Sequence, residues 1–221
     1  MVARLAAPRR RDAQRTRERI LDIAMREFAA RGYDGARVDA IVAACGMSKN
    51  LLYHYFAGKE ALFIEVMERA YAAMRTRQND IALTGHDPVG DVRTLVTHMV
   101  QHFAESPAFI SLLAHENLHK ARHIRKSSAI EVMFNPLIGT LKRLIRQGQQ
   151  QKLFRKDVDW VDLYISIAGM ASYFISNRHT LSTVLKVDLS TAARLRKRMR
   201  HVPEMVIAYL CEGATPARRT R

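Results

Sequence analysis

Apolar residues recur at intervals of three and four along nearly all of this 221-residue chain, which is the periodicity of one face of an α-helix. Nowhere do Val, Ile and Thr alternate with polar residues over six positions, as they do in a half-buried strand. The 10 glycines and 6 prolines fall mainly between the helical patterns. The sequence therefore predicts an all-α fold of about nine helices, without an internal repeat.

The predicted helices are separated by glycine, proline or short polar stretches. They cover about 12–31, 38–45, 48–56, 59–78, 92–104, a segment starting at 106, 123–151, 158–178 and 190–211. We expect an N-terminal helix-turn-helix three-helix bundle followed by a larger helical domain. The expected division is a basic disordered arm over 1–11, a helix-turn-helix domain over 12–60, an effector-binding and dimerisation domain over 61–211, and a flexible tail over 212–221.

The charge of the chain indicates a polyanionic partner. Lys and Arg number 36 against 21 Asp and Glu, a net charge of +15, which attracts nucleic acid or an anionic membrane surface. Two cysteines, Cys45 and Cys211, do not make a disulfide framework, which favours a reducing compartment. No stretch reaches the ~18 apolar residues of a membrane helix, and the N-terminus lacks the apolar region of a signal peptide. We expect a cytoplasmic, nucleoid-associated protein without a membrane partner.

Residues 38–56 have the pattern of a helix-turn-helix. Gly46 suits the left-handed conformation that the sharp turn requires, and Ser48 suits the N-cap of the next helix. That helix would enter the major groove of DNA with its first residues at the base edges. We expect the Ser48 cap to set the helix at the DNA surface.

The same helix carries side chains suited to reading bases. Lys49, Asn50 and His54 face away from its apolar stripe; Lys suits guanine acceptors and Asn suits adenine, while Leu51 suits a thymine methyl. Three further side chains can donate hydrogen bonds to DNA phosphates, which fixes the position of the protein on the duplex without reading its sequence: Tyr53, Tyr55 and Lys59. The alternative for the tyrosines is a place in the core of a small helical bundle.

These residues carry a resemblance to a known family. In order, the chain contains an apolar first helix (Ile20 to Phe28), a G-x-S turn (Gly46 to Ser48), L-Y-x-Y-F (Leu52 to Phe56) and K-E-A-L (Lys59 to Leu62). Over about residues 14–63 the sequence resembles the tetracycline-repressor (TetR) family of bacterial regulators. The resemblance implies a homodimeric, ligand-responsive DNA-binding repressor, with a palindromic double-stranded operator and a small-molecule effector as its partners.

The second helix departs from the pattern of that family, which commonly opens it with a hydroxyl side chain that touches phosphate. Here the positions are Ala36 and Arg37, and we expect Arg37 to replace that contact with a charged one. Asp39 would be repelled by phosphates unless it accepts from a cytosine amine or pairs with Arg37, so its role is left open. Further arginines lie near the N-terminus, and contact with DNA phosphates and plain solvation are the alternatives for each: Arg4, Arg9, Arg10, Arg11, Arg15 and Arg17.

Residues His115 to His119 form an H-E-x-x-H motif, in which two histidines on one helical face can hold zinc and the Glu can activate water. No third ligand follows at the expected spacing, because Arg125 stands there. We expect a polar contact in a ligand pocket instead, with a metal-dependent hydrolase as the rival function. No Walker, G-x-S-x-G or G-x-G-x-x-G motif occurs, so we expect no catalytic residue, no metal and no cofactor.

The later helices are expected to hold the effector and the subunit interface. Apolar and directional polar side chains on mixed helical faces are the pocket candidates, with plain core as their alternative: Met67, Tyr71, Phe103, Phe109, Leu112, His115, Phe134, Tyr164 and Tyr173. The resemblance implies dimerisation through the last two long helices, here near 158–178 and 190–211. Intramolecular packing is the alternative for both segments. A second rival function is a DNA-binding protein without sequence preference, driven by charge alone.

Overall fold

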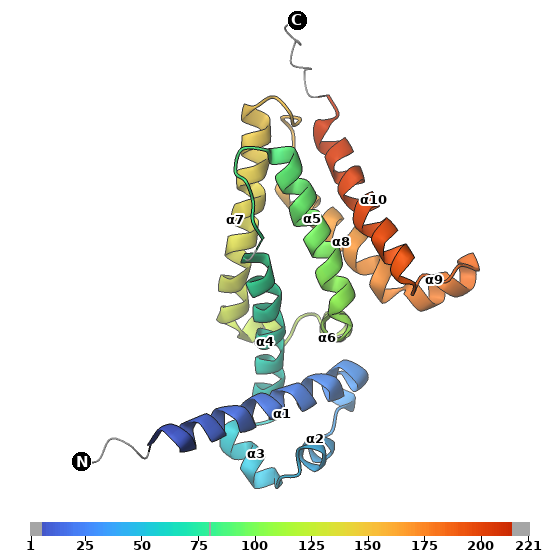
Figure 1. The fold of residues 1–221 in the computed structure, drawn as a ribbon. Helices are drawn as coiled ribbons and strands as arrows, with labels where there is room; N and C mark the ends of the chain where they lie inside the picture. Colours follow the sequence, from blue (N-terminus) through green and yellow to red (C-terminus); the bar gives the residue numbers. More distant parts are fainter. Residues whose placement is uncertain (1–5, 80, 214–221) are drawn as a thin grey trace, which may run out of the picture. The chain divides into compact units, whose positions relative to one another are not determined.

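The computed structural model describes residues 6–79 and 81–213, and the all-α prediction is confirmed: these residues form helices and no strand. The elements are α1 (Ala6–Gly35), α2 (Val38–Cys45), α3 (Lys49–Tyr55), α4 (Lys59–Asn79), α5 (Pro88–Glu105), α6 (Pro107–Leu118), η1 (Ile124–Lys126), α7 (Ser128–Gln150), α8 (Trp160–Ser176), α9 (Arg178–Leu185) and α10 (Ala192–Cys211) (Figure 1). No helix among them is both long enough and apolar enough to span a bilayer.

Three differences from the predicted helices concern the start of α1, the division of one helix and an additional helix. α1 begins at Ala6, so residues 6–11 are helical where the sequence predicted an arm. The predicted helix over 123–151 is divided, because Ser127 is extended and its hydroxyl accepts from the Ile130 N–H, which starts α7 afresh. α9 was not predicted, since its short, mostly polar sequence carries little apolar periodicity. Residues 1–5 of the predicted arm and 214–221 of the predicted tail lie outside the described residues.

The chain divides into two compact units. The first comprises residues up to Ala72 together with Ala108–Glu131, and the second comprises Ala73–Pro107 and the chain from Val132 onward. α6, η1 and the first turn of α7 thus belong with the N-terminal helices, whereas the sequence placed all of 61–211 in one domain.

The first unit is built on aromatic packing between α1 and α4. Phe28 and Phe63 are both fully buried and meet edge to face, with ring centroids 4.9 Å apart. Ile41 of α2 and Leu52 of α3 are also fully buried, which joins the two short helices to the same core. Burying such a side chain stabilises the fold by roughly 1.5–3 kcal/mol, so short helices persist here that would be marginal alone.

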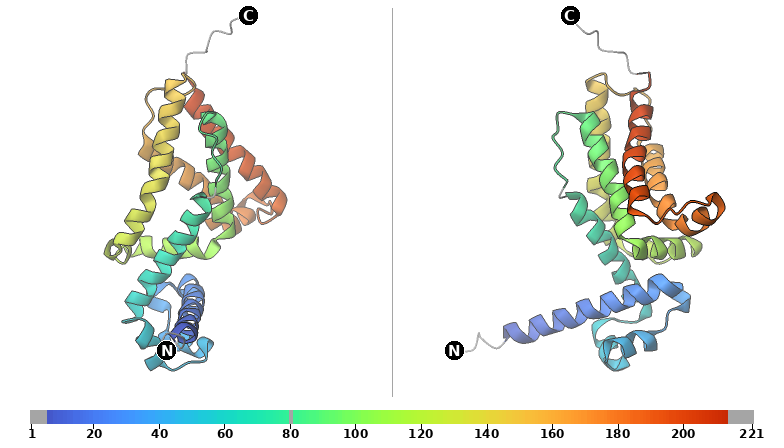
Figure 2. Two further views of the ribbon diagram at one scale, coloured as in Figure 1. Left: turned by 60° about the vertical axis from the view of Figure 1, so that its left-hand side comes forward. Right: turned by 45° about the vertical axis from the view of Figure 1, so that its right-hand side comes forward.

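The second unit is a bundle in which α5 lies between its neighbours. α10 and α8 both pack on α5, and α7 belongs to the same unit (Figure 2). Each of the four helices contributes at least one essentially inaccessible side chain to the core: Val100, Leu144, Ile167 and Val202. Pro203 lies inside α10, where it removes the N–H that would bond the Met199 carbonyl; the Thr97 hydroxyl of α5 donates to that carbonyl instead, at 3.5 Å.

Candidate nucleic-acid interface

The turn between α2 and α3 has the conformation predicted from its residues. Gly46 is left-handed, with φ 65° and ψ 38°, and its N–H donates to the Ala43 carbonyl at 3.1 Å. Ser48 is extended, and its hydroxyl accepts from the Leu51 N–H at 3.2 Å, which caps α3. Glycine and serine thus end one helix and begin the next within three residues.

α3 separates its buried face from its exposed face cleanly. Leu52 is fully buried and Phe56, just beyond the helix, is 3% exposed. Leu51 and Tyr53 are 42% and 43% exposed, and Lys49, Asn50 and His54 are exposed as well. Tyr55 is half-buried and packs edge to face on His54, with centroids 5.8 Å apart. Donors and acceptors suited to base edges therefore lie on the accessible side of a helix whose other side is fixed in the core.

Asp39, whose role the sequence left open, pairs with Lys49. Its Oδ1 lies 3.0 Å from Lys49 Nζ, and this hydrogen bond and charge raise the pKa of Lys49. Arg37 is exposed and its backbone N–H donates to Glu27 Oε1 at 3.2 Å, while α2 begins without a side-chain cap. The cationic Lys49 is thus kept near the first turn of α3 by a partner on α2.

Lys59 is directed toward the end of α1. Its Nζ lies 3.5 Å from the Asp34 carbonyl and 4.7 Å from the centroid of the Tyr33 ring. The sequence proposed it as a phosphate donor, and it is only half-exposed. In this structure Lys59 ties the start of α4 to α1, and the next turn of α4 places Leu62 and Phe63 in the core of the first unit.

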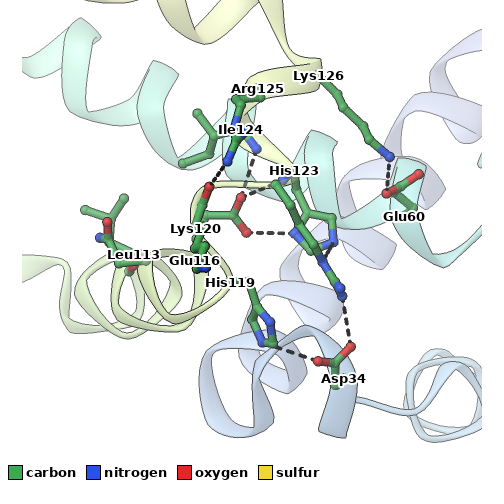
Figure 3. Close-up of polar contacts among 12 residues, drawn as sticks. Asp34, Glu60, Leu113, Glu116, His119, Lys120, His123, Ile124, Arg125 and Lys126 are labelled. Carbon is green, nitrogen blue, oxygen red and sulfur yellow. Dashed lines mark hydrogen bonds and ion pairs between the residues drawn. The ribbon is translucent and has the colours of Figure 1, made fainter.

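The segment after α6 is joined to these helices through a buried carboxylate. Glu116 and His123 are each 1% exposed, and Figure 3 shows how their side chains meet. Glu116 Oε1 accepts from the backbone N–H groups of His123 and Ile124, at 2.7 and 3.0 Å, and Oε2 lies 2.7 Å from His123 Nδ1. All three of these contacts are made with the loop that follows α6.

His123 continues the contact into the aromatic core of the first unit. Its ring lies 4.2 Å from the Tyr33 ring and 4.8 Å from the Phe63 ring, centroid to centroid. The intervening residues Lys120 and Ala121 are both left-handed, with φ 57° and 58°. Such a conformation costs roughly 1–2 kcal/mol for each non-glycine residue. The Glu116 side chain offsets part of this cost, together with backbone bonds such as that from the Ala121 N–H to the Glu116 carbonyl at 2.9 Å.

The two histidines of the H-E-x-x-H motif both contact residues of α1. A Cβ added to Gly32 would lie 2.7 Å from His115 Nδ1, so His115 packs directly on the α1 backbone at its break. His119 Nε2 lies 3.3 Å from Asp34 Oδ2, and Arg122 Nη2 lies 3.0 Å from Oδ1 of the same carboxylate (Figure 3). Within the described ranges, no group of three His, Cys, Asp or Glu side chains is placed to hold a metal.

The predicted pocket residues are divided between the two units. Met67, Tyr71, Phe109, Leu112 and His115 belong to the first unit, and Phe103, Phe134, Tyr164 and Tyr173 to the second. The structure brings together Phe134 and Tyr164, whose rings meet edge to face at 5.8 Å. Tyr173 is 58% exposed and lines a separate hollow with α9 and α10.

The sequence missed Arg75, which lies beside Phe134 and Tyr164. Its side chain is buried and its guanidinium carbon lies 4.2 Å from the centroid of the Phe134 ring. Burial raises the pKa of the Tyr164 hydroxyl, while the charge of Arg75 and a hydrogen bond with it act in the opposite direction. No local pattern distinguishes this arginine from a solvated one.

Two family models match the chain. The model of bacterial regulatory proteins of the tetR family matches residues 20–66, and that of the tetracyclin repressor-like C-terminal domain matches residues 88–206. The first includes the capped helix α3 and the second covers most of the bundle.

Curated proteins and solved structures are similar to this chain over most of their length. The chain is 36% identical to the HTH-type transcriptional repressor NicS of Pseudomonas putida over 190 residues, 86% of this chain and 90% of that protein. It is 30% identical to the transcriptional regulator SCO4942 from Streptomyces coelicolor, with a TM-score of 0.68 over 86% of this chain and 97% of that one. A TetR regulator from Chloroflexus aurantiacus, 22% identical, shares the fold, with a TM-score of 0.67 over 90% and 98% of the two chains.

Proposed function

The chain belongs to the tetracycline-repressor (TetR) family of bacterial transcriptional regulators, and on that premise we propose that it is a ligand-responsive repressor that binds a palindromic operator as a homodimer. The relative NicS is named a transcriptional repressor, which supports the negative sign of regulation. The observation that carries the proposal is the capped helix α3, with Leu52 buried and Lys49, Asn50 and His54 exposed.

Base reading would use the exposed face of α3. Asn50 can bond adenine in two places, and His54 lies one turn further along the same face. Lys49 can donate to guanine, and its partner Asp39 can accept from a cytosine amine on the same base step. Ser48, Leu51, Tyr53, Tyr55 and Arg37 complete the proposed contact set. Lys59 is kept in the set only as the residue that connects α4 to α1, because its ammonium is directed at the end of α1.

Selection of DNA from a random library tests this reading. We expect a palindromic sequence to be enriched and bound about 10³-fold or more tightly than random DNA at the same salt concentration. Asn50→Ala should weaken that binding by ~10-fold or more, since a good bidentate base contact is worth about 1–3 kcal/mol of discrimination. Arg146→Gln, which also alters one exposed polar side chain, is the control and should bind as the wild type does.

Equal affinity for all sequences would contradict the proposal and favour the charge-driven DNA binder. In that case affinity would still fall with salt, by ~0.9 in the log–log slope for each phosphate neutralised. Asn50→Ala would then leave affinity unchanged. The two readings are thus separated by the sequence preference at one salt concentration and by the Asn50→Ala variant.

The dimer would form through α8 and α10. Large apolar side chains are exposed on both helices: Val161, Ile165, Tyr173, Met205 and Tyr209. Gly169 is exposed between them on α8, with nothing within 4 Å of the position that a Cβ would take, so a partner helix can approach closely. Ile165→Glu should convert the dimer to a monomer in sedimentation velocity, because it places a charge at the centre of this face. A dimer of unchanged stability would contradict the assignment.

We further infer that the chain is not an enzyme and acts in the cytoplasm at the nucleoid. The position of Glu116 supports the first inference: its oxygens accept from backbone N–H groups and His123, so it is not directed at a bound water. The inference would be overturned if the purified protein showed peptidase or esterase activity and the Glu116→Gln variant lost that activity while remaining folded.

A further inference from the structure

A hollow of about 300 Å³ opens in the second unit between the end of α4, α5 and α7. Its lining residues combine apolar side chains with arginine and threonine: Arg75, Ile81, Leu83, Leu95, Pro136, Leu137, Thr140 and Arg143. Its volume lies at the lower end of the range for small-molecule sites, which suits a single ring or a short acyl chain. Leu95 and Leu137 are buried and form its apolar floor.

Arg75 is the polar group built most deeply into this hollow. It is 6% exposed, and its guanidinium packs over the Phe134 ring and contacts the Tyr164 hydroxyl. These two contacts fix the plane of the guanidinium, so its orientation is set before any ligand arrives. Arginine buried in this way is suited to bidentate recognition of a carboxylate or phosphate.

The described residues that line the hollow carry charge of one sign. Arg75 and Arg143 contribute two cations and Thr140 contributes a hydroxyl, and among these described lining residues there is neither Asp nor Glu. Asp91 lies nearby in the chain, but its carboxylate accepts from the N–H groups of Thr84 and Gly85, at 2.7 and 2.8 Å. Those bonds fix the loop that carries Leu83, and they direct the Asp91 carboxylate at that loop.

Pro136 shapes the α7 wall of the hollow. Because proline lacks an N–H, it cannot bond the carbonyl of Val132 one turn earlier, which loosens the helix at this point. Leu137, Thr140 and Arg143 follow at helical spacing and place an apolar, a hydroxyl and a cationic group on one side of α7.

We propose that this hollow binds the anionic group of the small effector, a carboxylate or a phosphate, with Arg75 and Arg143 as its cationic contacts and the leucines around its apolar part. The proposal rests on the ligand-responsive function proposed above and specifies the chemical class of the ligand. Arg75 supplies an oriented guanidinium group that can donate two hydrogen bonds, and Thr140 supplies a hydroxyl donor. Arg143, which is exposed, supplies charge at the mouth.

Matched pairs of probes test the charge requirement. Benzoate with benzamide examines carboxylate, and phenyl phosphate with phenol examines phosphate; each is titrated calorimetrically into the full-length dimer without DNA. We expect one anion to bind saturably and ~10-fold or more tightly than its neutral counterpart. The anion that binds identifies the source of the charge. Failure of both anions to exceed their counterparts would overturn the proposal.

Variants then locate the site. Arg75→Met should weaken binding of that anion about 10- to 100-fold, which is the value of one or two charge-assisted hydrogen bonds. Arg143→Gln, on the exposed rim, should weaken it a few-fold and keeps the test decisive if Arg75→Met does not fold. Arg93→Gln removes an arginine that lines a different hollow, between α5 and α10, and is the control. Wild-type affinity in both Arg75→Met and Arg143→Gln, or an equal loss in Arg93→Gln, would overturn the location.

Operator binding separates this inference from the proposed function. With the selected operator, the bound anion should change DNA affinity of the wild type and leave Arg75→Met unaffected at the same concentration. Anion binding that leaves DNA affinity unchanged would overturn the effector role. Absence of any preferred DNA would overturn the proposed function, while calorimetry without DNA would still report on the hollow.

Discussion

Replacement of Glu116 by Gln tests whether the buried carboxylate holds the α6–η1 segment in the first unit. Glutamine has nearly the same shape, so the packing of the 1%-exposed side chain is conserved. One amide oxygen remains to accept from the backbone N–H groups of His123 and Ile124. The amide nitrogen replaces the oxygen that lies 2.7 Å from His123 Nδ1 and removes the charge from that contact.

The expected loss of stability depends on which hydrogen-bonding groups remain in the variant. Removing a charged acceptor leaves buried donors unpaired, which costs about 1–3 kcal/mol and more for charged groups, and an amide recovers part of this through its oxygen. We therefore expect Glu116→Gln to lower the free energy of unfolding by roughly 2–3 kcal/mol. For a chain of this size that corresponds to a fall in Tm of about 4–12 °C. Glu116→Ala, which also opens a cavity, should lie at or beyond the upper end.

Thermal unfolding followed by circular dichroism measures this effect, with Glu131→Gln as the matched control. Glu131 is an exposed carboxylate of the same unit and should change the free energy of unfolding by less than about 0.5 kcal/mol. A double-mutant cycle with His123→Gln isolates the pair and should give a coupling above about 1 kcal/mol. A Tm for Glu116→Gln equal to that of Glu131→Gln would refute the assigned role of the carboxylate.

Two further predictions follow from backbone geometry and from a lowered pKa. Gly32→Ala should destabilise the chain more than Gly46→Ala, which parallel Tm measurements will show. Both glycines have a positive φ, but a Cβ would lie 2.7 Å from His115 Nδ1 at Gly32 and would have no atom within 4 Å at Gly46. Burial raises the pKa of Asp91, but hydrogen bonds from Thr84 and the next N–H outweigh it, so the pKa falls below 3.8. Its stabilisation is present above pH 3.8 and is lost as the pH falls through the lowered value, so the Tm gap between Asp91→Asn and wild type should be full at pH 7 and shrink below pH 3.8.

The helix-turn-helix was predictable because its signals are local. Gly46 and Ser48 specify the turn within three residues, and the apolar spacing from Ile41 to Phe56 determines which face of α3 is buried. Each signal acts through backbone conformation or nearest-neighbour packing, so one sequence is sufficient to read it. The exposed positions of Lys49 and Asn50 follow from the same periodicity.

The support beneath this motif was not predictable, because it depends on contacts between distant residues. The spacing of Glu116 to two histidines predicts a role beside them. Its actual partner is His123, which lies beyond two left-handed residues that no sequence pattern indicates. Arg75 presents the same difficulty. Its neighbours in the sequence are those of an ordinary helix, and only burial against Phe134 marks it as unusual.

The size of the Arg75 contribution limits how an effector can act on this regulator. Moving a two-state equilibrium from 1:99 to 99:1 requires about a 10⁴-fold difference in affinity between the states. An oriented arginine supplies about 10- to 100-fold if it meets the ligand in one state only. The remaining factor has to come from apolar burial, and at ~25 cal/mol per Å² a further 100-fold needs roughly 110 Å² of additional contact. Leu83 and Leu95 line the hollow and can supply such a contact, so an effector that is anionic but lacks an apolar part should bind without releasing DNA.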